Sequence, residues 1–375
     1  MLTQEKGRKV ATFMAASLKY EVEYPDSFTV TSTMSGYKHT SPPSQATIIA
    51  KNILTDIMQF RRVANPQTAC TASSCQKCLA PHLSKIVSAV EQKKPVTFVL
   101  PAFPGKSPNL AKVLGPLPDM AERCALEFLQ HLCDRVRRFY SPGARIVLCS
   151  DGRVFSDAVG MRDEDVTGYQ EEISKMIAVL GLTSISTFNL EVPYEGLSFD
   201  EMRRRLMERH GEPLDVLKAS INRGKDLDCD VHDREAHRLY CGITRFLVED
   251  AMHPGQKQSR SSLQKECRIR AYTVIQRSKA WGEFIEKQFP DSVRLSIHPQ
   301  SCGDKKLGIR LIDPDNWQTP WHGVAVYVEG RYMLLKRSQA EALGAHLVTR
   351  FGRPSHYVLT DKEGLSKLLG NEYEA

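Results

Sequence analysis

The sequence predicts an α/β protein with a Rossmann-like, mostly parallel sheet flanked by helices, a helical insertion and a C-terminal β-rich part. Two observations carry this prediction. Between residues 95 and 190, short apolar runs rich in β-branched residues alternate with amphipathic helical patterns, as in parallel βαβ units. After residue 293, short apolar runs return without comparable helices between them. The 375 residues suffice for one large α/β domain or two modest ones.

The N-terminal quarter is expected to precede the main domain. Residues 1–45 are predicted to be an extension, partly loop, because they contain the Ser-, Thr- and Pro-rich run TVTSTMSGYKHTSPPS. Residues 46–94 are predicted to be a helical lead-in that carries a cysteine cluster. An apolar stripe begins after Ser44, and a second helix fits residues 81–93. Residues 95–375 then form the main α/β domain.

The main domain is predicted to open with alternating strands and helices. Its first strands are expected at 95–100, 144–150 and 184–190, with helices at 119–140 and 163–181. The middle is rich in Arg, Lys and Glu and is predicted to be mostly helical over 198–288, with one long helix over 257–288. Later strands are expected at 293–298, 306–312, 323–328 and 331–336, with a short helix at 338–345. Ligands of parallel sheets bind at the carboxyl ends of the strands, so the residues that follow each strand are the candidates for a site.

The composition is ordinary for a globular protein. The 51 basic and 44 acidic residues give a net charge of +7, too mild to indicate a nucleic acid or an anionic membrane as a partner. No apolar run reaches the roughly 18 residues that indicate a membrane span, and no secretory signal is apparent. We therefore expect a cytoplasmic protein whose ten cysteines are thiols.

The loop after the first expected strand reads LPAFPGKSPN (100–109) and contains Lys106. Three prolines stiffen this loop, because each fixes φ near about −65°. A lysine held in a stiff loop at a strand end suits an anion such as phosphate, and the alternative is a solvated lysine. Asp119 and Glu122 follow at the expected N-cap and third position of a helix, so capping competes with a catalytic role there.

The loop after the second expected strand reads SDGRVFSD (150–157), in which Asp151 and Arg153 flank Gly152. Gly152 permits a tight turn at the strand end. Arginine binds phosphate or carboxylate through its planar fork. An Asp–Arg ion pair within the loop is the alternative to substrate binding.

Two later segments add further polar candidates. If 293–298 is a strand, period 2 puts Arg294, Ser296 and His298 on one face, which indicates a pocket wall because buried polar side chains need polar partners. His298 titrates near neutrality and suits acid–base catalysis. Trp321 and His322 lie together at the entrance of a later strand, where His322 is a second candidate pocket histidine.

A cysteine cluster precedes the main domain. Cys70, Cys75 and Cys78 have a spacing that suggests zinc or an iron–sulfur centre. They are three thiols, and the nearest candidate for a fourth ligand is His82, so no complete metal site is predicted. The motifs of dinucleotide enzymes, P-loop NTPases, zincins and α/β-hydrolases are absent from the sequence.

Taken together, the strand-end segments resemble the pyoverdine/dityrosine biosynthesis family, whose best-known members are isocyanide (isonitrile) synthases. The segments are LPAFPGKSPN with LPDMAE (117–122), SDGRVFSD, RLSIHP (294–299) and TPWHGVAV (319–326). They occur in the family's order, and residues 270–290 also fit. The resemblance covers about residues 80–355.

The resemblance implies an isonitrile synthase of secondary metabolism. In that reaction the amino group of an L-amino acid, typically Tyr, Trp or an aliphatic one, condenses with the C2 ketone of ribulose 5-phosphate. Enolisation, elimination and carbon–carbon cleavage then leave the former C2 as the isonitrile carbon. The resemblance implies no metal, flavin or nicotinamide cofactor. The implied partners are the two small-molecule substrates, with room for downstream tailoring enzymes.

This chemistry needs anion anchors and several proton transfers, which are the residue types found after the strands. The acid–base candidates are Asp151, His298 and His322. The substrate-binding candidates are Lys106, Arg153, Arg294, Ser296 and Trp321. One alternative is a dityrosine-type enzyme that forms an N-formyl amino acid. Another is a non-catalytic protein that binds a metal or a nucleic acid.

Overall fold

The computed structural model of the chain describes residues 43–64, 70, 75–253, 255–315, 317–361, 364 and 368. The predicted N-terminal extension lies outside the described residues up to residue 42. From Pro43 onward the chain forms one compact unit.

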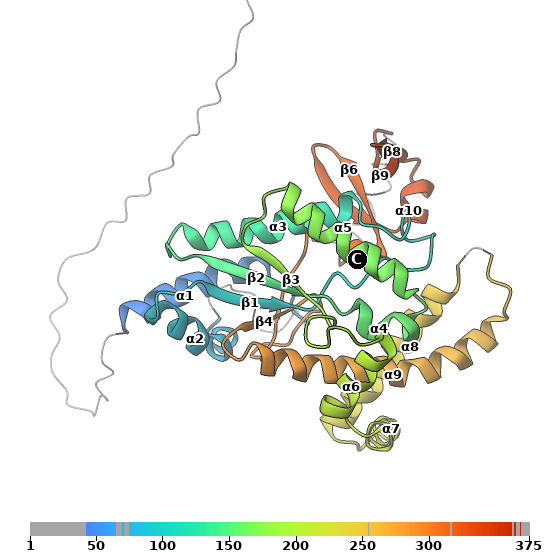
Figure 1. The fold of residues 1–375 in the computed structure, drawn as a ribbon, viewed down its shortest axis with the longest axis horizontal. Helices are drawn as coiled ribbons and strands as arrows, with labels where there is room; N and C mark the ends of the chain where they lie inside the picture. Colours follow the sequence, from blue (N-terminus) through green and yellow to red (C-terminus); the bar gives the residue numbers. More distant parts are fainter. Residues whose placement is uncertain are drawn as a thin grey trace, which may run out of the picture. The chain divides into compact units, whose positions relative to one another are not determined.

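A five-stranded parallel sheet lies at the centre of this unit (Figure 1). Its strands are β1 (Val96–Leu100), β2 (Ala144–Cys149), β3 (Ile185–Phe188), β4 (Val293–Ser296) and β5 (Leu307–Gly308). Their order is β3-β2-β1-β4-β5, with every neighbouring pair parallel. This arrangement confirms the predicted Rossmann-like class. The order reverses between β1 and β4, and in such sheets ligands bind beyond the carboxyl ends of the strands at the reversal.

Helices cover both faces of the sheet because its strands are apolar on both sides. In β1, Phe98 and Leu100 enter one core and Val99 enters the other. The first core is covered by α1 (Gln45–Ile57), α2 (Gln76–Glu91), α3 (Met120–Arg137) and α5 (Asp163–Val179). The second core is covered by α4 (Gly152–Val159), α6 (Phe199–His210) and α9 (Arg260–Gln288). Figure 1 shows α3 and α5 along one side of the sheet and α9 along the other.

The helical insertion and the β-rich C-terminal part are both present. The insertion comprises α6, α7 (Leu214–Arg223), α8 (Val231–Ala251) and α9, which is the single long helix expected from the sequence. A second sheet has the order β7-β6-β9-β8. Its strands are β6 (Val324–Val328), β7 (Arg331–Leu335), β8 (His346–Arg350) and β9 (Arg353–Val358), and α10 (Arg337–Ala342) lies between β7 and β8 in the chain.

Several local predictions need correction, among them the strand expected at 306–312, which is reduced to Leu307–Gly308. The segment 150–157, expected to be a loop, turns directly into α4, which ends at Gly160 in the left-handed conformation. Helix α2 begins at Gln76 rather than at residue 81, with Pro81 inside it at the cost of one backbone hydrogen bond. Strands β8 and β9 were not expected, because β8 is almost wholly exposed and carries no apolar alternation.

None of the described helices is long and apolar enough to cross a membrane.

Candidate active site

The polar residues predicted at strand ends gather where the strand order reverses. The loop that carries Lys106 follows β1, Asp151 follows β2, and Arg294 lies on β4 beside Val99 of β1. The 3₁₀ turn η2 (Pro320–His322) packs against the loop after β1, since the backbone N–H of Ser107 donates to the carbonyl of Trp321 over 2.9 Å. Residues more than 200 positions apart thus meet at one edge of the sheet.

Arg294 and Asp151 are two buried groups with unused hydrogen-bonding capacity. Nη1 of Arg294 and Oδ1 of Asp151 have no hydrogen-bond partner among the described residues. Burial lowers the pKa of Arg294. Burial also raises the pKa of Asp151 to about 6, against the opposing effects of a backbone hydrogen bond and the charge of Arg294. An anion and an exchangeable proton on a ligand would satisfy both groups.

Lys306 is a further cation near Arg294 that the sequence did not indicate. Partial burial and repulsion from Arg294 lower the pKa of Lys306, although its side chain reaches solvent. Two positive charges that repel each other at a sheet edge favour an anion between them. No local motif pointed to Lys306, because its proximity to Arg294 comes from the pairing of β4 with β5.

Ser296 and His298 do not continue the strand as predicted, because β4 ends at Ser296. The hydroxyl of Ser296 accepts from the backbone N–H of His298 over 3.1 Å, so it organises the turn that ends the strand. His298 lies in this turn and is exposed at its rim. Desolvation of its ring by the neighbouring chain, together with the positive charges of Arg62 and Lys306, lowers the pKa of His298. His298 is therefore neutral at pH 7 and able to accept a proton.

Lys106 is fully engaged within the protein. Its ammonium group lies 2.9 Å from Oδ2 of Asp119 and 2.8 Å from Oε2 of Glu122, and it donates to the carbonyl of Pro320 over 3.0 Å. Burial acts to lower the pKa of Lys106, but the two carboxylates outweigh this effect and raise it. Asp119 and Glu122 also form the predicted capping box of α3, so they cap the helix and neutralise Lys106 together.

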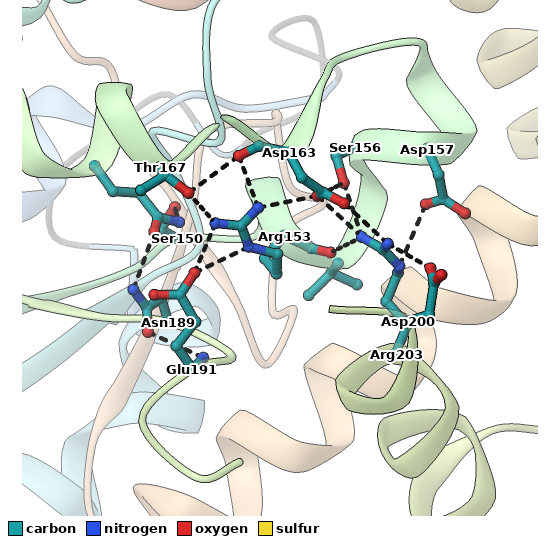
Figure 2. A network of polar contacts seen from close by, with 12 residues as sticks. Ser150, Arg153, Ser156, Asp157, Asp163, Thr167, Asn189, Glu191, Asp200 and Arg203 are labelled. Carbon is teal, nitrogen blue, oxygen red and sulfur yellow. Dashed lines mark hydrogen bonds and ion pairs between the residues drawn. The ribbon is translucent and has the colours of Figure 1, made fainter. Parts of the chain in front are cut away.

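Arg153 is likewise held by internal partners, which Figure 2 shows. Its guanidinium donates to Glu191, to the side chain and carbonyl of Asp163, and to the hydroxyl of Thr167 over 2.6–3.0 Å. Its plane lies over the ring of Phe199, 3.6 Å from the centroid. All five donors of this fully buried side chain are engaged, and Asp151 is not among the acceptors.

A second group of polar residues surrounds His322. Asp250, near the end of α8, accepts from the hydroxyl of Ser107 over 2.9 Å and from Nζ of Lys112 over 2.5 Å. Nδ1 of His322 is 3.9 Å from Oδ2 of Asp250 and has no hydrogen-bond partner in the described chain. Burial lowers the pKa of His322 to about 4, although Asp250 opposes this shift. The ring of Phe246 packs edge-on against His322.

The sequence missed Ser107, Lys112 and Asp250. Ser107 lies in the proline-rich loop that was already predicted to bind an anion through Lys106, so its position in that loop could have identified it. Lys112 and Asp250 are 138 residues apart, and neither has a motif of its own. Trp321 does lie in this region, but it is buried against Phe103 with ring centroids 5.3 Å apart. Trp321 therefore packs beneath the loop after β1 and does not present an exposed surface for binding.

A cavity of about 890 Å³ lies between α8 and α9 and reaches the same loop. Tyr240 and Tyr272 line it, with ring centroids 4.7 Å apart. Basic side chains also line it, including Arg245 and Arg268. Asn109 borders the cavity and donates to the carbonyl of Glu249 over 3.0 Å, which joins the loop after β1 to the end of α8.

Comparisons with known proteins agree with this architecture. The model of the family described as pyoverdine/dityrosine biosynthesis protein matches residues 86–348. The L-tryptophan isonitrile synthase AmbI2 of Fischerella ambigua is 44% identical over 320 residues, which cover 85% of this chain and 94% of that protein. An L-tyrosine isonitrile synthase of Pseudomonas aeruginosa is 42% identical over 314 residues, covering 82% of this chain and 93% of the relative. The crystal structure of PvcA from Pseudomonas aeruginosa superposes with a TM-score of 0.77 at 42% identity, covering 83% of this chain and all of that one.

Proposed function

Because the chain belongs to the pyoverdine/dityrosine biosynthesis family, we propose that it is an isonitrile synthase. The proposed reaction converts the amino group of an L-amino acid to an isonitrile, with ribulose 5-phosphate as the carbon donor. The relatives named above act on tryptophan and tyrosine according to their names, so we propose an aromatic amino acid as the substrate. The product would serve secondary metabolism and pass to tailoring enzymes.

The observation that carries this proposal is the pair of buried, unsatisfied atoms on Arg294 and Asp151 where the strand order reverses. Arg294 and Lys306 offer positive charge, and Nη1 of Arg294 is buried without an acceptor in the described structure. We assign the phosphate of ribulose 5-phosphate to these two residues. Asp151 lies near Arg294 and has a pKa of about 6, so it is able to give and take a proton near neutral pH.

His322 is the proposed second proton carrier. It is neutral at pH 7, because its pKa is lowered to about 4, and its Nδ1 is free to accept a proton. Imine formation, enolisation and elimination each move a proton between carbon, nitrogen and oxygen. Asp151 and His322 come from different segments of the chain, which lets each serve a different step. Neither phosphate binding nor these proton transfers require a metal or an organic cofactor, so we propose a metal-independent reaction.

The cavity between α8 and α9 is the proposed site of the aromatic side chain. Tyr240 and Tyr272 give it an aromatic wall, which favours a flat apolar group. Its border at Asn109 and Glu249 adjoins Asp250 and therefore the surroundings of His322. An amino acid bound there would direct its α-amino group toward the loop after β1.

Product analysis tests this function directly. The purified protein is incubated with ribulose 5-phosphate carrying ¹³C at C2 and with each of the twenty amino acids, and products are identified by mass. We expect a labelled isonitrile from an aromatic amino acid. A labelled N-formyl amino acid, heavier by one water, would indicate the dityrosine-type branch instead. The absence of any labelled nitrogen-containing product would contradict both.

Kinetics of two variants test the phosphate assignment. Arg294→Met and Lys306→Met should each raise the KM for ribulose 5-phosphate at least tenfold, since a charged hydrogen bond contributes roughly 1.5–3 kcal/mol. The KM for the amino acid should change little. Lys305→Met, at the neighbouring exposed lysine, is the matched control and should behave as the wild type.

A further inference from the structure

Four cysteine sulfurs converge beside the turn that follows β4, where none of them belongs to the groups described above. Cys70, Cys75, Cys78 and Cys302 place their Sγ atoms within 4.8 Å of one another. The separations are 3.0 Å for Cys70–Cys78, 3.4 Å for Cys78–Cys302 and 3.7 Å for Cys75–Cys302. Cys302 is the fourth ligand that the sequence could not supply, because it lies 224 residues after Cys78.

These separations of 3.0–3.7 Å bring the four sulfurs as close together as one tetrahedral ion needs, and the ion would move the nearest pair about 0.8 Å further apart. Four thiolates at about 2.3 Å from a Zn²⁺ ion stand about 3.8 Å apart along each edge of the tetrahedron. An iron–sulfur cluster requires a wider arrangement, because its cysteines bind different iron atoms. Two disulfides would draw the sulfurs into separate pairs at about 2.05 Å, whereas here Cys78 is close to both Cys70 and Cys302.

The backbone holds the ligands in place through short, defined turns. Cys75 is the N-cap of α2, and the backbone N–H of Cys78 donates to its carbonyl over 3.0 Å. Cys302 lies in a turn closed by the backbone N–H of Ser301 donating to Asp304 over 2.7 Å. Gly303 in this turn has a φ of 90°, a conformation that favours glycine. The turn packs against α2, since a Cβ at Gly303 would lie 3.1 Å from the side chain of Lys77.

Positive charge lies near the four sulfurs, where it would stabilise a doubly negative tetrathiolate zinc centre. Arg61 donates to the carbonyl of Cys70 over 2.6 Å. Lys306 lines a small hollow together with Cys78 and Cys302, whereas the guanidinium of Arg62 in the same hollow is paired with Asp315. Arg61 and Lys306 would offset the net charge of −2 that remains when four thiolates bind one Zn²⁺ ion.

We propose that Cys70, Cys75, Cys78 and Cys302 bind one structural Zn²⁺ ion. All four positions are protein sulfurs, so the site is closed to substrate, as structural zinc sites are. The ion joins α2 and the segment before it to the turn after β4. The segment before Cys70 is also joined to this region by two backbone hydrogen bonds. The N–H of Ala64 donates to the carbonyl of Gln300 in the turn, and the N–H of Arg62 donates to the carbonyl of Gly308 in β5. Cys302 lies within residues 86–348, which the family model matches. The other three cysteines precede the matched residues.

Elemental analysis of the full chain, purified without added metal or chelator, is the test. We expect one zinc per chain, and we expect Cys78→Ser and Cys302→Ser to lower the zinc content to near zero and to melt earlier. Cys241→Ser, at an exposed cysteine on α8, is the matched control and should keep one zinc. Wild-type protein without zinc, or with an equimolar amount of iron in its place, would overturn the proposal.

Cobalt substitution keeps the test independent of whether the variants fold. Wild-type chain stripped of metal under reducing conditions and reloaded with Co²⁺ should show thiolate-to-cobalt charge transfer and the intense visible bands of a tetrahedral site. Excess Zn²⁺ should remove these bands. Weak octahedral bands, or disulfides detected in place of the four thiols, would contradict the site. Neither measurement depends on isonitrile formation, so failure of the proposed function would leave this result unaffected.

Discussion

Lys106 and Arg294 are both basic side chains at the end of the sheet, yet their surroundings differ in kind. Lys106 neutralises two buried carboxylates, whereas Arg294 has a buried nitrogen without an acceptor in the described chain. Lys106→Met should therefore lower the free energy of unfolding by about 3–5 kcal/mol, because it leaves buried charges unpaired. Arg294→Met should unfold at or above the wild-type denaturant midpoint while losing activity.

Denaturant unfolding and kinetics measured on the same samples distinguish these two roles. The informative comparison is between the two variants, since both remove one positive charge and introduce the same side chain. If Lys106→Met were as stable as the wild type and only raised the KM for ribulose 5-phosphate, Lys106 would be a substrate anchor after all. The role predicted for it from sequence would then hold.

His322 makes stability and activity depend on pH in a defined direction. Its pKa falls from about 6.5 in the unfolded chain to about 4 in the folded protein, chiefly through burial. Between these values the unfolded state binds the proton and the folded state does not, so stability falls as pH drops through this window. We expect His322→Gln to lose less stability than the wild type between pH 7 and pH 5.

The same variant should lower kcat at pH 7 by roughly 10²–10⁴-fold if His322 transfers a proton. His346→Gln, at an exposed histidine of β8, is the matched control and should keep wild-type turnover. A His322→Gln enzyme with normal kcat and the shallower pH dependence of stability would show that the side chain is structural. Thermal melts from pH 5 to pH 7 measure the pH dependence of stability, and kinetics at pH 7 measure kcat.

At this scale the sequence could identify candidates but not their partners. Asp151 was a candidate because it follows a strand, and Arg294 because period 2 puts it on the polar face of one, which local patterns reveal. The engagement of Arg153 could not be found, since Glu191, Asp163 and Thr167 reach it from other elements and no pattern in the sequence relates them. For the same reason the sequence could not distinguish a substrate-binding arginine from one that is buried with all its donors satisfied.

Gly152 shows how one residue decides the packing of an element. A Cβ at this position would lie 1.7 Å from the carbonyl oxygen of Pro104, which is backbone and cannot rotate away. Gly152→Ala must displace either α4 or the loop after β1. We expect a loss of roughly 1–3 kcal/mol in unfolding free energy, as for an overpacked core, and a fall in kcat because the loop carries Lys106 and Ser107.

Gly282→Ala is the matched control, because this glycine lies within α9 and a Cβ there meets nothing within 4 Å. It should be neutral or stabilising by up to about 1 kcal/mol, owing to the higher helix propensity of alanine. Denaturant unfolding of both variants measures the difference. Equal stability of the two would mean that the close contact between α4 and Pro104 is not required.

Elements with strong apolar periodicity were predicted well, and elements defined by tertiary contacts were not. The strands β1 and β2 are apolar on both faces and α3 has one apolar stripe, so these elements follow from their own sequences. Helix α9 was expected from a composition rich in Arg, Lys and Glu. Helix α4 is only 8 residues long and begins at a glycine, so its segment resembled a turn. Strand β8 pairs with β9 at an exposed edge, where no buried face imposes alternation.

At the scale of the whole molecule, Asp250 joins three parts of the fold. It lies at the end of the helical insertion and accepts from Ser107 and Lys112 of the loop after β1. The backbone carbonyl of Lys112 in turn accepts from Arg337 of α10, beside the second sheet. No part of the sequence indicated this connection, because each of these contacts joins residues more than 130 positions apart.

We therefore expect Asp250→Ala to disturb both stability and catalysis. Asp250 is 2% exposed and Lys112 is 4% exposed, so the substitution leaves a buried ammonium without its main partner. The expected loss is about 3–5 kcal/mol in unfolding free energy. Loss of the negative charge beside His322 should also lower the pKa of that histidine further, because Asp250 now acts to raise it.

Glu266→Ala is the matched control, since it removes a carboxylate from an exposed pair with Arg270 and should cost about 0–1 kcal/mol. Denaturant unfolding measures the stability of both variants, and an NMR titration of the histidines follows His322. If Asp250 joins the insertion to the sheet, Asp250→Ala should also raise the KM for the amino acid, because the cavity between α8 and α9 borders the same loop at Asn109. A variant that loses stability while retaining the wild-type KM and kcat would instead show that Asp250 supports the fold without organising the site.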